Sequence, residues 1–134
     1  MTLNFSVNDK LVIDGSNGMT PDLKTDWNKV DLCAPLSLKD GVVHPFVDGE
    51  TFVGILSFKN IKNAEIDIVG VNSIEASYLK GGYFFNVICK EAVQVGDKVE
   101  PTVGGFKKAA GDGVGVALTQ GTVDGVILVR GGNY

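Results

Sequence analysis

The stretch that decides the fold is VGILSFKNIKNAEIDIVG, residues 53–70, because it recurs as VGVALTQGTVDGVILVRG, residues 114–131. The two stretches have equal length and carry glycine and aliphatic residues at matching places. The matched pairs are Val53 and Val114, Gly54 and Gly115, Ile55 and Val116, Ile66 and Ile127, Ile68 and Val129, and Gly70 and Gly131. Two copies cannot form the stacked array of a solenoid, so the recurrence predicts a duplicated small β unit.

A second pair of matching stretches lies upstream, where VVHPFVDG at residues 42–49 aligns with KVEPTVGG at residues 98–105. The matches are Val43 and Val99, Pro45 and Pro101, Val47 and Val103, and Gly49 and Gly105. We therefore expect residues 53–70 and 114–131 to superpose, with Gly54 and Gly115 in equivalent places.

Residues 36–134 are predicted to form the duplicated β domain, because short β-branched and aromatic runs alternate there with Asp-Gly and Gly-Gly turns. The predicted strands cover residues 42–47, 52–58, 65–71, 74–78, 83–89, 98–103, 114–118 and 125–130. Short strands with frequent turns are typical of a β-sandwich or a small β-barrel. The fold class is therefore all-β. Ile66, Ile68, Ile127 and Val129 are predicted to point into the core.

Residues 1–35 are predicted to form an N-terminal arm or hairpin. Leu3, Phe5 and Val7 alternate with polar residues, which is the period of a half-buried strand. Such a segment either belongs to the protein's own sheet or adds as a strand to a neighbouring subunit. A short helix can also form between residues 17 and 32, starting at Thr20-Pro21. Leu23, Trp27 and Val30 fall there at helical spacing. The candidate partner-binding residues are Leu3, Phe5, Val7 and Trp27.

Composition restricts the other classes of protein. The chain has 134 residues, 44% of them hydrophobic, which suffices for one core but not for two well-buried ones. It carries 16 acidic and 12 basic residues without a basic cluster, which disfavours nucleic-acid binding. It has no long apolar run and no secretory pattern at its start, so we expect no membrane contact and folding in the cytoplasm. Cys33 and Cys89 lack metal-binding spacing and are expected to be free buried thiols.

Few residues suggest catalysis or metal binding. His44 is the one histidine, near Asp48 and Glu50, and in the upstream alignment Glu100 takes its place, which favours a surface polar position. The chain has no G-x-S-x-G motif, and its GDGVG segment at residues 111–115 lacks the lysine of a phosphate-binding loop. We therefore expect no enzyme activity, metal or cofactor. Tyr83-Phe84-Phe85 must place at least one aromatic ring outside the core, as a candidate partner anchor.

The motifs GDKVEP, GGFKKAAGDG, GVAL and VILV follow one another between Gly96 and Val129. Their order resembles the small decoration, or cement, proteins of tailed-bacteriophage capsids, and VVHPFVDGETFVGIL is similar to the same pattern. The resemblance covers residues 36–130. It implies a non-enzymatic β protein that folds in the host cytoplasm, forms a homo-oligomer (a trimer or dimer), and binds the major capsid protein. It further implies a place on the exterior of the virion, where the protein bridges capsid subunits and stabilises the shell.

A second function remains open at the level of sequence. A β-barrel recognition module of a phage tail or surface assembly would bind protein or carbohydrate. A sugar site would line up Trp or Tyr rings with carboxylates in a groove, whereas a cement protein would show an apolar patch or an arm. One tryptophan and three tyrosines favour the cement protein.

Overall fold

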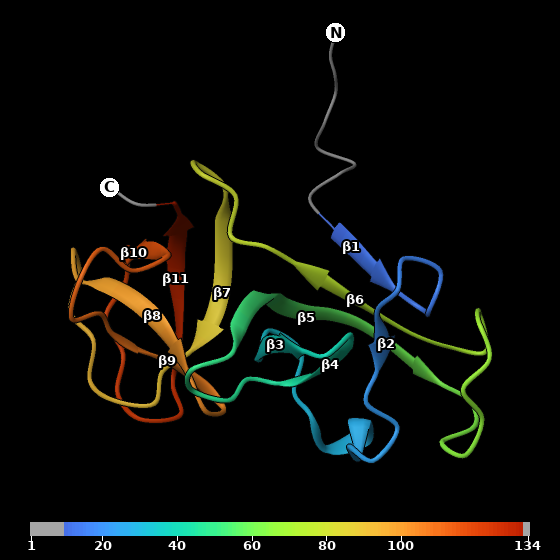
Figure 1. Ribbon diagram of the computed structural model, residues 1–134. Helices are drawn as coiled ribbons and strands as arrows, with labels where there is room; N and C mark the ends of the chain where they lie inside the picture. Colours follow the sequence, from blue (N-terminus) through green and yellow to red (C-terminus); the bar gives the residue numbers. More distant parts are fainter. Residues whose placement is uncertain (1–9, 133–134) are drawn as a thin grey trace, which may run out of the picture.

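The computed structural model describes residues 10–132 and contains two β-sheets, which lie side by side in Figure 1. Sheet A has the order β1 (Lys10–Ile13), β6 (Asn72–Ser77), β5 (Thr51–Ile61), β3 (Pro35–Lys39), β4 (Val42–Pro45) and β2 (Thr20–Pro21). Sheet B has the order β7 (Phe84–Ile88), β11 (Val126–Gly131), β10 (Gly115–Ala117), β8 (Lys98–Thr102) and β9 (Gly105–Lys108). The predicted all-β class is confirmed.

The strand order of sheet B matches the first five strands of sheet A. In each sheet a hairpin (β3–β4 or β8–β9) lies beside a third strand (β5 or β10), then the last strand of the sheet (β6 or β11), then the first (β1 or β7). Leu36 lies opposite Gly54 in sheet A, and Val99 lies opposite Gly115 in sheet B. Gly54 and Gly115 therefore take corresponding register positions.

Both of these glycines are needed for close approach. A Cβ atom on Gly54 would lie 2.7 Å from the carbonyl oxygen of Ser77 on the neighbouring strand. A Cβ atom on Gly115 would lie 2.8 Å from the carbonyl oxygen of Arg130, again on the neighbouring strand. A larger residue would push the strands apart at the same place in each sheet.

The sequence alignment of the repeats is wrong beyond these glycines. Residues 65–71 form a loop instead of a strand, and Ile68 is exposed there. The strand that corresponds to β11 is β6, where Ile74 and Ala76 are buried, as are Ile127 and Val129 in β11. The inward placement is thus confirmed for Ile127 and Val129 and wrong for Ile68, whereas Ile66 is half-buried in the loop.

The upstream alignment is also wrong. Val43 lies in β4, the second strand of its hairpin, whereas Val99 lies in β8, the first strand. By register, Leu36 corresponds to Val99 and Val43 to Phe106. Short glycine-aliphatic motifs suit both strands of a hairpin, so similarity of sequence alone does not distinguish the two.

The described part of the N-terminal segment lies in sheet A. β1 pairs antiparallel with β6, and β2 pairs parallel with β4, so Thr20-Pro21 does not begin a helix. The predicted helix is reduced to a 3₁₀ turn, Trp27–Lys29. Asp22 and Asp26 accept hydrogen bonds from backbone N–H groups two residues ahead, and such local bonds compete with helix formation.

The chain builds two hydrophobic clusters, where composition predicted one core. The sheet A cluster contains Ile13, Trp27, Leu36, Val43, Leu56, Ile74 and Ala76. The sheet B cluster contains Ile55, Leu79, Val87, Cys89, Val93, Val99, Phe106, Ala117, Ile127 and Val129. Ile55 comes from β5 of sheet A, and the Phe52 ring packs edge-on against Phe106 with centroids 6.1 Å apart. These contacts join the two halves, which lets each half be small.

Both cysteines are free thiols, as predicted. Cys89 is buried in the sheet B cluster and Cys33 is half-buried against it. Burial raises the pKa of both thiols, so neither is activated as a nucleophile.

Candidate partner-binding site

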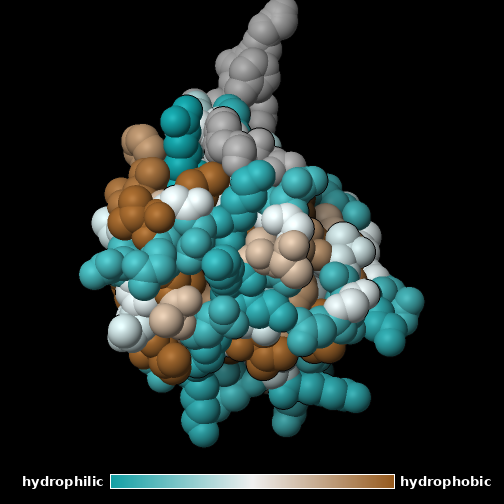
Figure 2. All heavy atoms as spheres, turned by 90° about the vertical axis from the view of Figure 1, so that its left-hand side faces the viewer, coloured by the Kyte–Doolittle hydropathy of each residue, from teal (hydrophilic) through white to brown (hydrophobic). Residues whose placement is uncertain are grey.

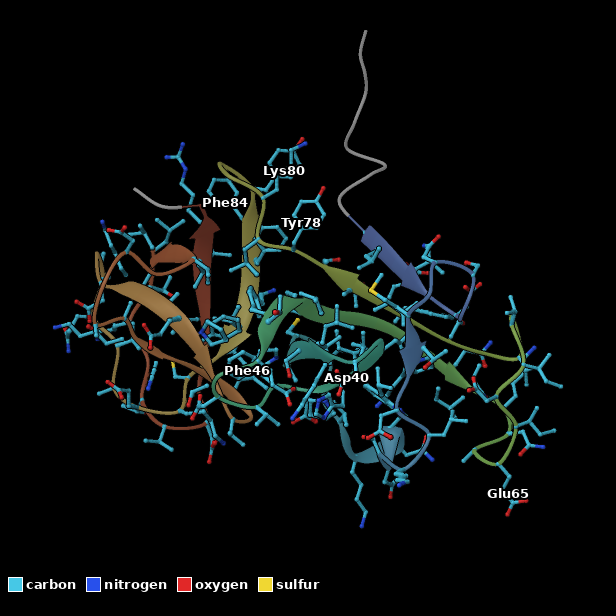
Figure 3. All side chains as sticks on the ribbon, viewed as in Figure 1. Asp40, Phe46, Glu65, Tyr78, Lys80 and Phe84 are labelled. Atoms are coloured by element: carbon cyan, nitrogen blue, oxygen red, sulfur yellow. The ribbon has the colours of Figure 1, made fainter. Side chains whose placement is uncertain are left out.

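Aromatic and cationic side chains gather at the turn between the two sheets. Tyr78 and Tyr83 are each 43% exposed, and Phe84 is 63% exposed. The Lys80 ammonium lies 4.6 Å from the centre of the Tyr83 ring. Figure 3 shows Tyr78, Lys80 and Phe84 together along the upper edge of the molecule, between the two sheets. We call Tyr78, Lys80, Tyr83, Phe84 and Arg130 the aromatic–cationic cluster.

The turn is held firmly by its neighbours. Leu79 is buried in the sheet B cluster between the exposed Tyr78 and the cationic Lys80. Tyr83 N–H donates to the Lys80 carbonyl (3.2 Å), and Gly82 N–H donates to the Gly131 carbonyl (3.1 Å). A Cβ atom on Gly131 would overlap the Lys80 carbonyl oxygen. The exposed rings therefore stand on a fixed support.

Strand pairing then sets which side chains join the cluster. Phe84 lies opposite Arg130 across β7 and β11, and both are exposed. Phe85, the next residue, packs against the sheet B cluster. The prediction that Tyr83-Phe84-Phe85 exposes an aromatic ring is confirmed.

The strands and the turn that carry the cluster contain no Asp or Glu residue. No Asp or Glu occurs in residues 76–90 or 125–134, which include all of β7 and β11. Val126, at the far end of β11, is also largely exposed. Figure 2 shows that apolar residues on the sheet B end of the molecule form separate groups among polar ones.

The predicted partner-binding residues do not meet in this site. Leu3, Phe5 and Val7 lie outside the described residues. Trp27 is 3% exposed and belongs to the sheet A cluster, and its indole Nε1–H donates to the Asp22 carbonyl (2.7 Å). Its candidacy as an exposed anchor is corrected: the ring is a core residue whose polar atom is satisfied internally.

His44 belongs to a small set of hydrogen-bonded polar side chains in sheet A, away from the aromatic–cationic cluster. Glu50 Oε1 lies 2.6 Å from His44 Nε2 and accepts a hydrogen bond from the buried Ser37 hydroxyl at 2.8 Å. These bonds, that of Ser37 above all, lower the pKa of the Glu50 carboxyl. Glu50 stands between the serine and the histidine, so His44 does not contact Ser37 as the base of a triad would. The counterpart of His44 in sheet B is Lys107, not Glu100.

Other binding chemistry is sparse in the described structure. Within residues 10–132, no three His, Cys, Asp or Glu side chains lie close enough to hold a metal ion. The same residues include no helix long and apolar enough to cross a membrane. A hollow of about 350 Å³ beside Trp27 is lined by Leu23, Lys24, Thr25, Asp26, Asn28, Ile61 and Ala64. No protein-family model and no curated protein sequence matches this chain.

Proposed function

We propose that this chain is a non-enzymatic structural protein that binds the outer surface of a tailed-phage capsid and stabilises the shell by bridging major capsid protein subunits. The motif order between Gly96 and Val129 supports this function. The observation that carries it in the structure is the aromatic–cationic cluster. Tyr, Phe and Arg side chains on a rigid support are typical of protein-binding hot spots.

We also infer that the two sheets are two copies of one barrel-like β unit. The shared strand order and the corresponding places of Gly54 and Gly115 support a duplication. A further likeness is a parallel backbone pairing to the second strand of the hairpin, made by Pro21 with Val43 in sheet A and by Cys89 with Phe106 in sheet B. Each contact places the segment that follows the first strand (β1 or β7) beside the hairpin. The two edges of each sheet are thereby brought closer together. Two joined units give a body that can touch more than one capsid subunit, which raises avidity.

A carbohydrate-binding module has less support. Sugar rings stack on exposed aromatic faces, but the ring of Trp27 is buried beside the hollow that it lines. The exposed rings of the cluster stand beside cations, without a carboxylate from their own strands. This chemistry suits a protein surface better than a sugar.

The proposed protein needs no cofactor and acts on the exterior of the virion after folding in the host cytoplasm. Its net charge of −4 suits that side of the shell, because the interior faces packed DNA. The partner is the major capsid protein.

Co-sedimentation with shells tests this function. Shells assembled from the major capsid protein encoded in the same genome are mixed with wild-type protein, Phe84→Ala and the control Phe58→Ala. Phe58 is an exposed phenylalanine of sheet A. We expect wild type and Phe58→Ala to pellet with the shells, and Phe84→Ala to bind at least about tenfold more weakly. Equal binding by both variants would show that the cluster does not contact the shell. No binding by the wild-type protein would reject the proposed function.

A further inference from the structure

The loop between β5 and β6, residues 62–71, exposes two apolar side chains, one of which, Ile68, the sequence pattern assigns to the core. Ile68 is 59% exposed and Val69 is 63% exposed. Glu65 and Asp67 are exposed beside them. We call Glu65, Asp67, Ile68 and Val69 the acidic–apolar loop. In Figure 3 Glu65 lies at the opposite end of the molecule from Phe84 and Lys80.

A buried asparagine holds this loop in one shape. The Asn72 side chain is almost fully buried, and its Oδ1 accepts from the backbone N–H groups of Lys62 (2.8 Å) and Asn63 (3.0 Å). Its Nδ2 donates to the carbonyls of Asn63 and Ile66, both at 2.8 Å. All four hydrogen bonds of the amide are thus made within the loop. Ile68 and Val69 are therefore exposed on a loop whose backbone is held by hydrogen bonds.

The two ends of the molecule carry opposite charge. Residues 10–79 contain ten Asp and Glu against six Lys, whereas residues 80–132 contain five Asp and Glu against six Lys and Arg. The acidic–apolar loop belongs to the first part, and Lys80 and Arg130 of the aromatic–cationic cluster belong to the second. The loop and the cluster are therefore complementary in charge, and both are apolar at their centres.

We propose that the acidic–apolar loop of one copy docks on the aromatic–cationic cluster of a second copy, so that the protein associates head to tail. Ile68 and Val69 pack on Tyr78, Tyr83 and Phe84. Glu65 and Asp67 face Lys80 and Arg130. Because each copy offers both surfaces, the contact is heterologous and forms a closed ring if the rotation between copies closes. This inference goes beyond the proposed function and does not depend on it. Because one cluster cannot contact the shell and a second copy at the same time, the two contacts compete for it.

Both surfaces are held in fixed shapes before they meet, which lowers the entropic cost of the contact. Association costs conformational entropy for each segment that becomes ordered, and Asn72 and the hydrogen-bonded turn have ordered these segments beforehand. Charge pairs at the edge of such an interface set partner choice and rate of association. We therefore expect association to weaken as salt is raised.

Sedimentation velocity of the full chain without shells tests the proposal. One variant reverses charge in the cluster (Lys80→Glu with Arg130→Glu), and the other reverses it in the loop (Glu65→Lys with Asp67→Lys). Each has a matched control elsewhere on the surface: Lys24→Glu with Lys29→Glu, and Glu91→Lys with Asp112→Lys. We expect wild type and controls to associate alike, and each reversal to weaken association about tenfold or more. Thermal melting of every variant checks that it stays folded.

Mixing the two reversal variants gives the decisive result. The loop variant keeps an intact cluster, and the cluster variant keeps an intact loop, so each intact surface also has its natural partner in the mixture. The reversed loop of one variant also meets the reversed cluster of the other with opposite charge, so we expect the mixture to regain association comparable to that of wild type. Loss of association by the cluster variant alone would show a face-to-face contact and overturn the head-to-tail arrangement. A wild-type protein that stays monomeric at low salt would overturn the proposal outright, whatever the result with shells.

Discussion

Sheets A and B share their inner faces but not their outer ones. Ile74 and Ala76 on β6 are buried, as are Ile127 and Val129 at the corresponding places on β11. On the outer face, sheet A carries Lys10, Ser73 and Glu75 where sheet B carries Phe84, Val126 and Leu128. Sheet A in turn exposes Val12, where sheet B carries Asn86, and Phe58 beside Glu75. Sheet A therefore shows that this strand order does not require apolar side chains at the three places of Phe84, Val126 and Leu128. We propose that these three side chains of sheet B serve partner binding.

The largest effect that would test this comparison is in the sheet B cluster. Phe106 is fully buried, and its counterpart in sheet A is the smaller Val43. We expect Phe106→Ala to cost about 3–5 kcal/mol of unfolding free energy, because it leaves a large cavity. Val43→Ala should cost about 1.5–3 kcal/mol. Urea denaturation measures both, and an equal or reversed order would contradict the matched positions.

A second comparison tests which strand of sheet A corresponds to β11. Ile74→Ala and Ile127→Ala should each cost about 2–5 kcal/mol, because both side chains are buried. Ile68→Ala should change the unfolding free energy by no more than about 0.5 kcal/mol, since the side chain is exposed. A large loss at Ile68 together with a small one at Ile74 would restore the alignment drawn from sequence.

The corresponding glycines give a smaller effect. We expect Gly54→Ala and Gly115→Ala each to destabilise the fold by about 1–3 kcal/mol, because the added Cβ meets the neighbouring strand. Gly54 adds a backbone cost, since its φ is +133°. Gly111→Ala is the control, because a Cβ atom there meets nothing within 4 Å. Neutral substitutions at both strand glycines would show that the sheets tolerate wider spacing.

The smallest expected effect is the pH dependence of the stability that Glu50 gives to the hairpin of sheet A. The pKa of Glu50 is lowered in the folded state by the Ser37 hydroxyl and by His44, from an ordinary value of 4.5. The stabilisation from its charged form is therefore full well above pH 4.5 and is lost as the pH falls through the lowered pKa. We expect Glu50→Gln to melt earlier than wild type at pH 7, with the difference shrinking in acid. Glu91→Gln, at an exposed site, is the control variant.

Local patterns in the sequence predicted the local features. Alternation in β11 placed Ile127 and Val129 inward, and adjacent aromatic residues at the start of β7 placed Phe84 outward. The Asp40-Gly41 turn was also predicted, and both residues take the positive φ that a two-residue hairpin turn requires.

The pairing of distant segments could not be predicted in the same way. Residues 66–68 have the alternation of a strand, but the Asn72 amide binds the Ile66 carbonyl and holds the segment as a loop. A single buried amide leaves no periodic signal in the sequence. Trp27 stands at helical spacing, yet Asp22 and Asp26 bind the nearby backbone N–H groups. The two partner surfaces require knowledge of which segments meet at each end of the molecule, which sequence spacing does not contain.

The most direct test of the central claim is imaging of shells after incubation with the wild-type protein. Expanded and unexpanded shells of the major capsid protein from the same genome are compared by electron microscopy. The account predicts added density on the outer surface at junctions between capsid subunits, with the end of sheet B that carries Phe84 against the shell. Bare shells, or density that contacts the shell only through the outer face of sheet A, would contradict it.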